Sequence, residues 1–193
     1  MKNLLIELKK AAIATAILVL ILCAVYPVTV WIISQLLFPW KANGSLVSHD
    51  NVPVGSVLIG QKFSAPDYFH PRPSSAGDGY DASHSGGSNL GPLSTKLIMQ
   101  IKNNGDEYRA ENRLSPDTPI PADAVTSSAS GLDPHISLEN ALLQAERVAQ
   151  NRGMDKRYLV NLLQSETEPR QFGIFGEPRI NVLTLNIRLD DRK

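Results

Sequence analysis

The hydrophobic pattern of the chain changes abruptly at Ala11, where a long uncharged stretch begins, and again after Trp40, where it ends. Residues 11–40 contain no Asp, Glu, Lys or Arg, and most of them are apolar. A helix needs about 20 such residues to cross the hydrocarbon core of a bilayer. The stretch continues through Val28–Ile33 without the small-residue cleavage site of a signal peptide. We therefore predict an uncleaved transmembrane helix over 11–38, with a buried core helix as the alternative, and a kink or local unwinding where Pro27 cannot donate to the carbonyl of Cys23.

Charges on the two sides of this segment indicate its orientation. Lys2, Lys9 and Lys10 outnumber Glu7 before it, whereas Lys41 is the first charge after it. Cytoplasmic flanks carry the excess of Lys and Arg. We expect residues 1–10 in the cytoplasm and residues 39–193 in an extracytoplasmic, periplasmic domain.

The first half of this domain is interrupted by turn-forming residues. Pro and Gly recur between 60 and 92, so regular elements there should be short. We predict a strand at 57–59 and a helix over 93–101 that ends at Asn104-Gly105. The sequence SPDTPIPAD at 115–123 is incompatible with a helix interior.

The second half has a clearer periodicity. An apolar stripe over 138–149 predicts an amphipathic helix with Ser137 as N-cap and Gly153 as stop. A second helix should follow, capped by Asp155. Alternating apolar residues over 183–189 predict a closing strand, with a bulge near Leu183. The expected fold is one N-terminal transmembrane helix plus a small α+β domain with a loop-rich first half.

Composition excludes several functions. Nineteen basic and nineteen acidic residues cancel, so no positive field favours nucleic acid. One cysteine, Cys23, rules out an internal disulfide. The four histidines lack metal-ligand spacing, and the common phosphate-loop and hydrolase motifs are missing. Asp81, His84 and nearby serines leave a hydrolase as a weak hypothesis.

One short loop has the composition of an anion site. Ser85, Gly86, Gly87, Ser88 and Asn89 combine two glycines with hydroxyls, and a predicted helix N-terminus follows. Such backbone N–H groups can bind an anion. A tight turn held by Ser and Asn side chains is the alternative.

Several strings in order along the chain resemble one family, the KdpC subunits of the bacterial Kdp potassium-transporting ATPases. They are Tyr26-Pro27, FPWKANGS at 38–45, LIGQ at 58–61, YFHPRPS at 68–74, SGGSNL at 85–90, SASGLD at 128–133, NVL at 181–183 and LN at 185–186. The resemblance implies an accessory subunit of a high-affinity K+ uptake pump in the bacterial inner membrane. The implied partners are a channel-like K+-binding subunit, a P-type ATPase subunit and a small membrane peptide. The phosphorylated D-K-T-G motif of such ATPases is absent from this sequence, so we expect a non-catalytic subunit.

The resemblance also suggests an alternative function, a catalytic chaperone that binds ATP and raises the ATP affinity of the ATPase subunit. ATP is the one cofactor that it suggests, and residues 85–89 would contact it. The charge bias places that loop outside, away from cytoplasmic ATP, so we favour an effect transmitted through the membrane. As partner contacts we predict the loop residues Gln61, Arg72, Asn89 and Asp133, each of which could instead cap a turn or pair locally.

Overall fold

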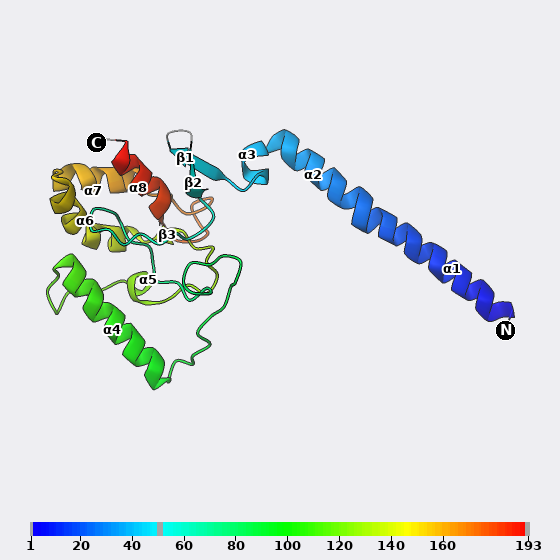
Figure 1. The fold of residues 1–193 in the computed structure, drawn as a ribbon, viewed down its shortest axis with the longest axis horizontal. Helices are drawn as coiled ribbons and strands as arrows, with labels where there is room; N and C mark the ends of the chain where they lie inside the picture. Colours follow the sequence, from blue (N-terminus) through cyan, green and yellow to red (C-terminus); the bar gives the residue numbers. More distant parts are fainter. Residues whose placement is uncertain (1, 50–51, 192–193) are drawn as a thin grey trace. The chain divides into compact units, whose positions relative to one another are not determined.

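The computed structural model describes residues 2–49 and 52–191 (Figure 1). The chain forms two units, residues 1–46 and 47–193, which are described separately below. The first is the N-terminal helical unit, and the second is a small α+β head. This is the fold class that the sequence predicts.

The N-terminal unit contains one long apolar helix. It comprises α1 (Lys2–Val19), the π-helical turn η1 (Leu20–Val25) and α2 (Tyr26–Leu37). Its 35 residues from Asn3 to Leu37 are long and apolar enough to cross a membrane. The short α3 (Pro39–Ala42) follows, and the Trp40 indole Nε1 donates to the carbonyl of Leu46 at 2.9 Å.

The π-helical turn lies directly before Pro27. The amide of Tyr26 donates to the carbonyl of Ile21, five residues back rather than four. A wider turn accommodates a proline, which brings no N–H of its own to the helix. The Thr29 hydroxyl donates to the carbonyl of Val25 at 2.7 Å. The predicted local unwinding near Pro27 is therefore confirmed, as a single π-helical stretch.

The head contains short strands and five helices among the described residues. Strands β1 (Leu46–His49) and β2 (Val52–Ser56) pair with each other, and β3 (His135–Ile136) pairs antiparallel with β4 (Ile180–Asn181). The helices are α4 (Thr95–Asn112), α5 (Ala122–Val125), α6 (Leu138–Arg152), α7 (Lys156–Ser165) and α8 (Val182–Asp190).

The core of the head lies among α6, α7, α8 and the β3–β4 pair (Figure 1). Ala141, Ala145 and Val148 on α6 are fully buried, as are Leu159 and Leu163 on α7. Alanines on α6 let the neighbouring elements approach closely. Phe69, from the loop-rich first half, is also fully buried in this core.

Helix α6 begins and ends as predicted, and α7 begins as predicted. The Ser137 hydroxyl accepts the amide of Asn140 at 3.1 Å, and Gly153 ends α6 with φ 64°. The Asp155 carboxylate accepts the amide of Arg157 at 2.7 Å. These bonds satisfy N–H groups that have no partner within the helix.

The predicted closing strand over 183–189 is wrong, because this segment is helix α8. Its buried residues are Val182, Leu183, Leu185, Asn186 and Leu189, a spacing of one helical face. Ile187, which the strand pattern placed on the buried face, is only half-buried. The predicted bulge near Leu183 is therefore also absent, and Asn181 instead caps the helix by accepting the amide of Thr184 at 3.3 Å.

The first half of the head differs from prediction in two elements. Helix α4 continues through Asn104-Gly105 to Asn112, and Gly105 is buried within it; its φ is not in the left-handed region that would end a helix. Residues 57–59 form a turn after β2 rather than a strand. Residues 115–121 are non-helical, as expected, and α5 begins at Ala122.

Candidate functional site

Four loops of the head are joined by backbone hydrogen bonds. We define the loop cluster as residues 60–61, 72–75, 85–89 and 126–133. Gly60 donates to Gly131 at 2.9 Å, Ser75 donates to Ser128 at 2.8 Å, and Gly86 donates to Ala129 at 2.8 Å. Segment 126–133 therefore holds the other three loops, and all eight predicted site residues lie in this cluster.

The close approach of segment 126–133 to the turn at 81–82 depends on Gly131. Its φ of 64° lies in the left-handed region, and a Cβ there would lie 2.8 Å from the backbone of Ala82. A side chain would separate the two loops. The glycine is thus required by packing between segments that are far apart in sequence.

Arg72 and Asp133, both predicted as partner contacts, bind each other. Arg72 Nη1 lies 2.7 Å from Asp133 Oδ2, and both side chains are about three-quarters buried. Arg72 Nη2 also reaches the carbonyl and hydroxyl of Thr126 at 3.3 Å, and the Tyr80 hydroxyl donates to the carbonyl of Arg72 at 3.1 Å. This ion pair connects two loops of the head, and a contact with a partner stays a prediction.

Gln61 is packed against β2. Its Nε2 donates to the carbonyl of Val54 at 3.1 Å, and a Cβ at Gly55 would overlap its amide group. Its Oε1 is buried and accepts no hydrogen bond from the residues that the structure describes. The side chain therefore lies over a glycine that leaves room for it.

The loop Ser85–Asn89 is exposed. The Ser85 hydroxyl donates to the carbonyl of Ser130 at 2.9 Å, and the amide of Gly86 donates to Ala129. One of the two glycine N–H groups is therefore already bonded within the head. Asn89 has φ 52°, a conformation that Asn tolerates better than most residues in turns. These bonds support the alternative of an ordered turn more than that of an anion site.

Asp81, Ser83 and His84 lie together without the arrangement of a hydrolytic triad. The Ser83 hydroxyl donates to Asp81 at 2.6 Å, and His84 Nδ1 lies 2.7 Å from Asp81 and 3.0 Å from the Ser83 hydroxyl. A triad needs the acid and the hydroxyl on opposite ring nitrogens. Hydrogen bonds from Ser83 and then His84 lower the pKa of Asp81 to about 2, so the carboxylate stabilises a local turn.

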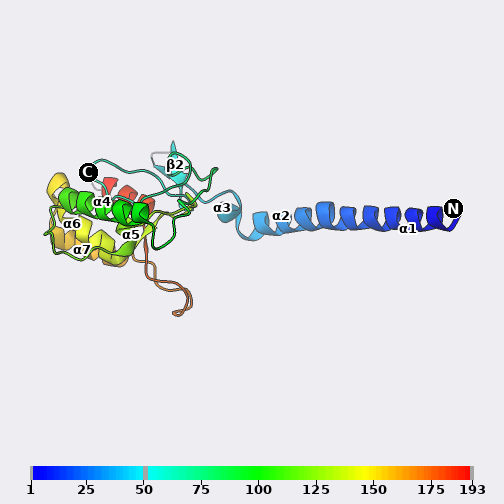
Figure 2. The same cartoon turned by 90° about the horizontal axis from the view of Figure 1, so that it is seen from below.

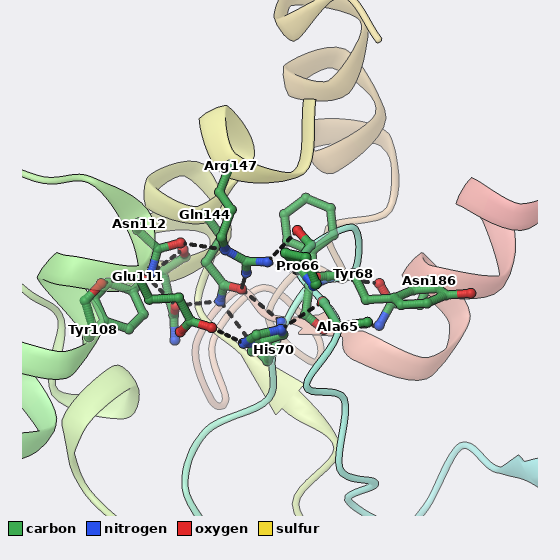
Figure 3. Close-up of polar contacts among 12 residues, drawn as sticks. Ala65, Pro66, Tyr68, His70, Tyr108, Glu111, Asn112, Gln144, Arg147 and Asn186 are labelled. Carbon is green, nitrogen blue, oxygen red and sulfur yellow. Dashed lines mark hydrogen bonds and ion pairs between the residues drawn. The ribbon is translucent and has the colours of Figure 1, made fainter. Parts of the chain in front are cut away.

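A buried polar network joins α4, α6, α8 and the loop at 65–70, and the sequence analysis missed it (Figure 3). Arg147 on α6 is 5% exposed. Its Nη1 donates to the carbonyls of Pro66 and Tyr68 at 2.7 and 2.9 Å, and its Nε donates to Asn112 at 2.9 Å. Its Nη2 donates to Gln144 at 2.8 Å. One guanidinium thus joins α4, α6 and the loop that precedes Arg72.

Two buried amide side chains hold the same loop through its backbone. Gln144 accepts the amide of His70 at 2.7 Å and donates to the His70 carbonyl at 3.1 Å. Asn186 on α8 accepts the amide of Phe69 at 2.9 Å and donates to its carbonyl at 3.0 Å. Each side chain replaces a strand neighbour by pairing with both the N–H and the C=O of one loop residue.

The network also contains ionisable groups, of which Glu111 is the most exposed, with 42% of its side chain accessible. His70 Nδ1 lies 2.9 Å from Glu111, and its Nε2 lies 2.9 Å from the carbonyl of Ala65. The hydrogen bond from His70 lowers the pKa of Glu111. Burial lowers the pKa of Arg147 and raises the pKa of Tyr108, whose hydroxyl donates to Asn140 at 2.8 Å.

The sequence did contain a pattern for this network. Asn140, Gln144 and Arg147 are spaced at i, i+4 and i+7, so they form a polar stripe beside the apolar stripe of α6. Buried polar stripes of this kind must find partners. Their partners could not be deduced, because they belong to loops and helices elsewhere in the chain.

Two further features bear on ligand binding, namely the distribution of metal-ligating side chains and the hollows of the head. Within residues 2–49 and 52–191, no three His, Cys, Asp or Glu side chains gather as a metal site would need. A hollow of about 300 Å³ lies between α4 and the loop at 70–73, lined by His70, Tyr80, Tyr108 and Glu111 among others. This hollow therefore lies beside the His70–Glu111 contact at the edge of the polar network.

A small α+β head on a chain with one apolar helix long enough to span a membrane is the build of a membrane-anchored subunit. Residues 8–191 match the family model described as KdpC, K+-transporting ATPase, c chain. The chain belongs to the KdpC family.

Relatives support this assignment over most of the chain. Each of the following is named potassium-transporting ATPase KdpC subunit. The protein of Mycobacterium tuberculosis (strain ATCC 25618 / H37Rv) is 52% identical over 86% of this chain and 88% of its own length. That of Nitratidesulfovibrio vulgaris is 50% identical over 94% and 92%. That of Koribacter versatilis is 46% identical over 98% and 94%.

Proposed function

We propose that the chain is a non-catalytic C subunit of an ATP-driven K+ uptake pump, and that its head docks on the extracytoplasmic surface of the channel-like subunit. There it stabilises the complex and supports high-affinity ATP hydrolysis coupled to K+ transport. The observation that carries the proposal is the family match over residues 8–191. The P-type ATPase subunit and a small membrane peptide complete the assembly.

The orientation rests on charge. Lys2, Lys9 and Lys10 precede the apolar helix, and Glu7 is the single acidic residue among them. Lys10 pairs with Glu7 at 2.8 Å, with both side chains about two-thirds exposed, and three lysines against one glutamate give this end of the sequence an excess of positive charge. Cytoplasmic placement of this end puts the head outside.

The architecture of the head suits docking rather than chemistry. Arg147, Gln144 and Asn186 fix the backbone of the loop at 66–70, and the Arg72–Asp133 pair fixes the loops beside it. A surface that is ordered before contact loses less conformational entropy when it binds. The exposed residues Ser88 and Asn89 are the candidate contacts in this cluster.

The test is removal of the head. The other pump subunits are co-expressed with the full chain or with residues 1–40, and the yield of purified complex and the K+ affinity of uptake are measured. We expect loss of stable complex or of high-affinity uptake. A normal yield and a normal K+ affinity with residues 1–40 alone would refute the proposal.

The ATP-binding alternative makes a different prediction for the same material. A photoreactive ATP analogue should label the full chain, and Gly86→Val should abolish the labelling while Gly153→Ala retains it. Our proposal expects no labelling at residues 85–89 in either protein. Labelling that depends on Gly86 would replace external docking with the chaperone function.

A further inference from the structure

The segment between α7 and α8 forms a small arm that extends from the head (Figure 2). Glu168 and Arg179 pair through both backbone groups at 2.8 and 3.1 Å, and Gln171 and Phe175 do so at 2.9 Å. The arm therefore has the pairing of a hairpin. We define its apolar tip as Phe172, Ile174 and Phe175.

The apolar tip is the most exposed aromatic cluster of the head. Phe172 is 93% exposed, Ile174 72% and Phe175 64%, whereas Phe69 in the core is 0% exposed. Single exposed apolar residues are common, but three large ones within four positions form a patch. Such patches mark interaction surfaces.

The tip is held in one conformation. The amides of Gly173 and Ile174 donate to the carbonyls of Arg170 and Gln171 at 3.0 and 3.1 Å. Phe172 has φ 54°, which is unfavourable for a bulky side chain. Strained residues of this kind are maintained where a particular shape is used.

The charges beside the tip cancel. Arg170 pairs with Glu177, and Arg179 pairs with Glu168 across the stem of the arm. A segment that binds a membrane surface usually adds unpaired Lys or Arg, which attract anionic headgroups. The apolar tip, which is ordered and has no net charge beside it, is instead suited to a preformed pocket in a protein. Buried aromatic residues supply most of the binding energy in such contacts.

We propose that the apolar tip inserts into an apolar pocket on another subunit of the same pump. The inference rests on the proposed function, because it needs the head and that subunit on one side of the membrane. The tip anchors the head from a point of the chain separate from the loop cluster. The partner is a protein surface. Contact of the tip with the lipid bilayer instead is the competing result that the crosslinking experiment below can detect.

The first experiment measures assembly of the full complex. Phe172→Asn and Phe175→Ser are introduced separately into the full chain, and the dissociation of the chain from the other subunits is followed in detergent. Asn tolerates positive φ, so Phe172→Asn should leave the melting temperature of the head unchanged or slightly raised. We expect dissociation to become at least tenfold faster for both variants. The matched control is Leu93→Ser, at a residue 91% exposed in a different part of the head, which should have no effect.

A photo-crosslinking amino acid at position 172 then identifies the neighbour. Crosslinks to a pump subunit support the proposal, whereas crosslinks to lipid alone, or none, overturn it. If removal of the whole head prevents assembly but the tip variants behave like the wild type, the tip inference fails and the proposed function stands. If removal of the head has no effect, the proposed function fails.

Discussion

Arg147 shows how single residues order the head. Its guanidinium is buried and donates to neutral oxygens of Pro66, Tyr68, Asn112 and Gln144; among the described residues it forms no ion pair with a carboxylate. Arg suits this position because its rigid fork presents several donors in fixed directions. Lys could not reach all four oxygens at once.

We expect Arg147→Ala to destabilise the head by about 3 kcal/mol or more, because buried acceptors lose their donors. The measurement is urea unfolding of the full chain in detergent, followed by circular dichroism. Arg188→Ala removes an arginine whose side chain is 63% exposed and should change stability by less than about 0.5 kcal/mol. Similar values for the two variants would contradict the structural role of Arg147.

Glu111 should make the stability of the head depend on acidity. Its pKa is below its usual value of 4.5, chiefly through the hydrogen bond from His70. A carboxyl group with a depressed folded-state pKa stabilises the protein above its unfolded pKa, and this contribution is lost as the pH falls through the folded pKa. We expect the difference in melting temperature between the wild type and Glu111→Gln to be largest near neutral pH and to shrink below pH 4.5.

The control for this comparison is Glu107→Gln, an exposed position one turn earlier on α4. Its melting temperature should follow that of the wild type at every pH. A constant difference between Glu111→Gln and the wild type from neutral pH to pH 3 would contradict the assigned role of the His70 contact.

At the scale of elements, local sequence patterns predicted the helices that have recognisable capping residues at their ends. Helices α6 and α7 have Ser137, Gly153 and Asp155 at their boundaries, where each residue satisfies the backbone. Helix α8 was missed because Leu183, Leu185 and Leu189 fit a strand alternation as well as a helical face. Asn186 distinguishes the two patterns, because it lies on the buried face of the helix. This polar residue is buried there because its side chain pairs with the backbone of Phe69.

The loop cluster was predicted as a set of residues but not as a set of contacts. Each loop could be identified from its Gly, Pro, Ser and Asn residues. The contact of Gly131 with Ala82 and the bond from Arg72 to Asp133 join segments that no local pattern relates. For the same reason the sequence analysis proposed Arg72 and Asp133 as partner contacts without finding that they bind each other.

Asn181 offers a test of α8 as a helix. Its side chain accepts the amide of Thr184 and donates to the carbonyl of Val57 at 2.9 Å. Asn181→Ala should lower the stability of the head by about 1–2 kcal/mol, since it removes an N-cap. Asn181→Asp keeps the capping oxygen and should lose less. Equal losses in thermal unfolding would show that the bond to Val57, and not the cap, stabilises this end.

At the scale of the molecule, the two units differ in which side chains they bury, and this difference indicates their roles. The apolar helix leaves its large side chains exposed along its length, which is stable in lipid and not in water. The head buries its own core and its own polar network. Under the proposed function, the chain contributes a membrane anchor and an ordered contact surface to the pump, and the ATPase chemistry belongs to another subunit.

Sidedness is the prediction on which the docking function and the apolar tip both depend. We expect a cysteine at exposed Ser88, in a Cys23→Ala background, to react with an impermeant maleimide on intact cells, because the positive flank retains the N-terminus inside. A cysteine at Leu5, close to that flank, should react only after permeabilisation. Ser88 lies in the loop that the ATP-binding alternative uses, so its labelling from outside also separates this loop from cytoplasmic ATP. Reaction of the Leu5 position on intact cells, with protection of Ser88, would reverse the orientation and restore direct nucleotide contact as the leading explanation.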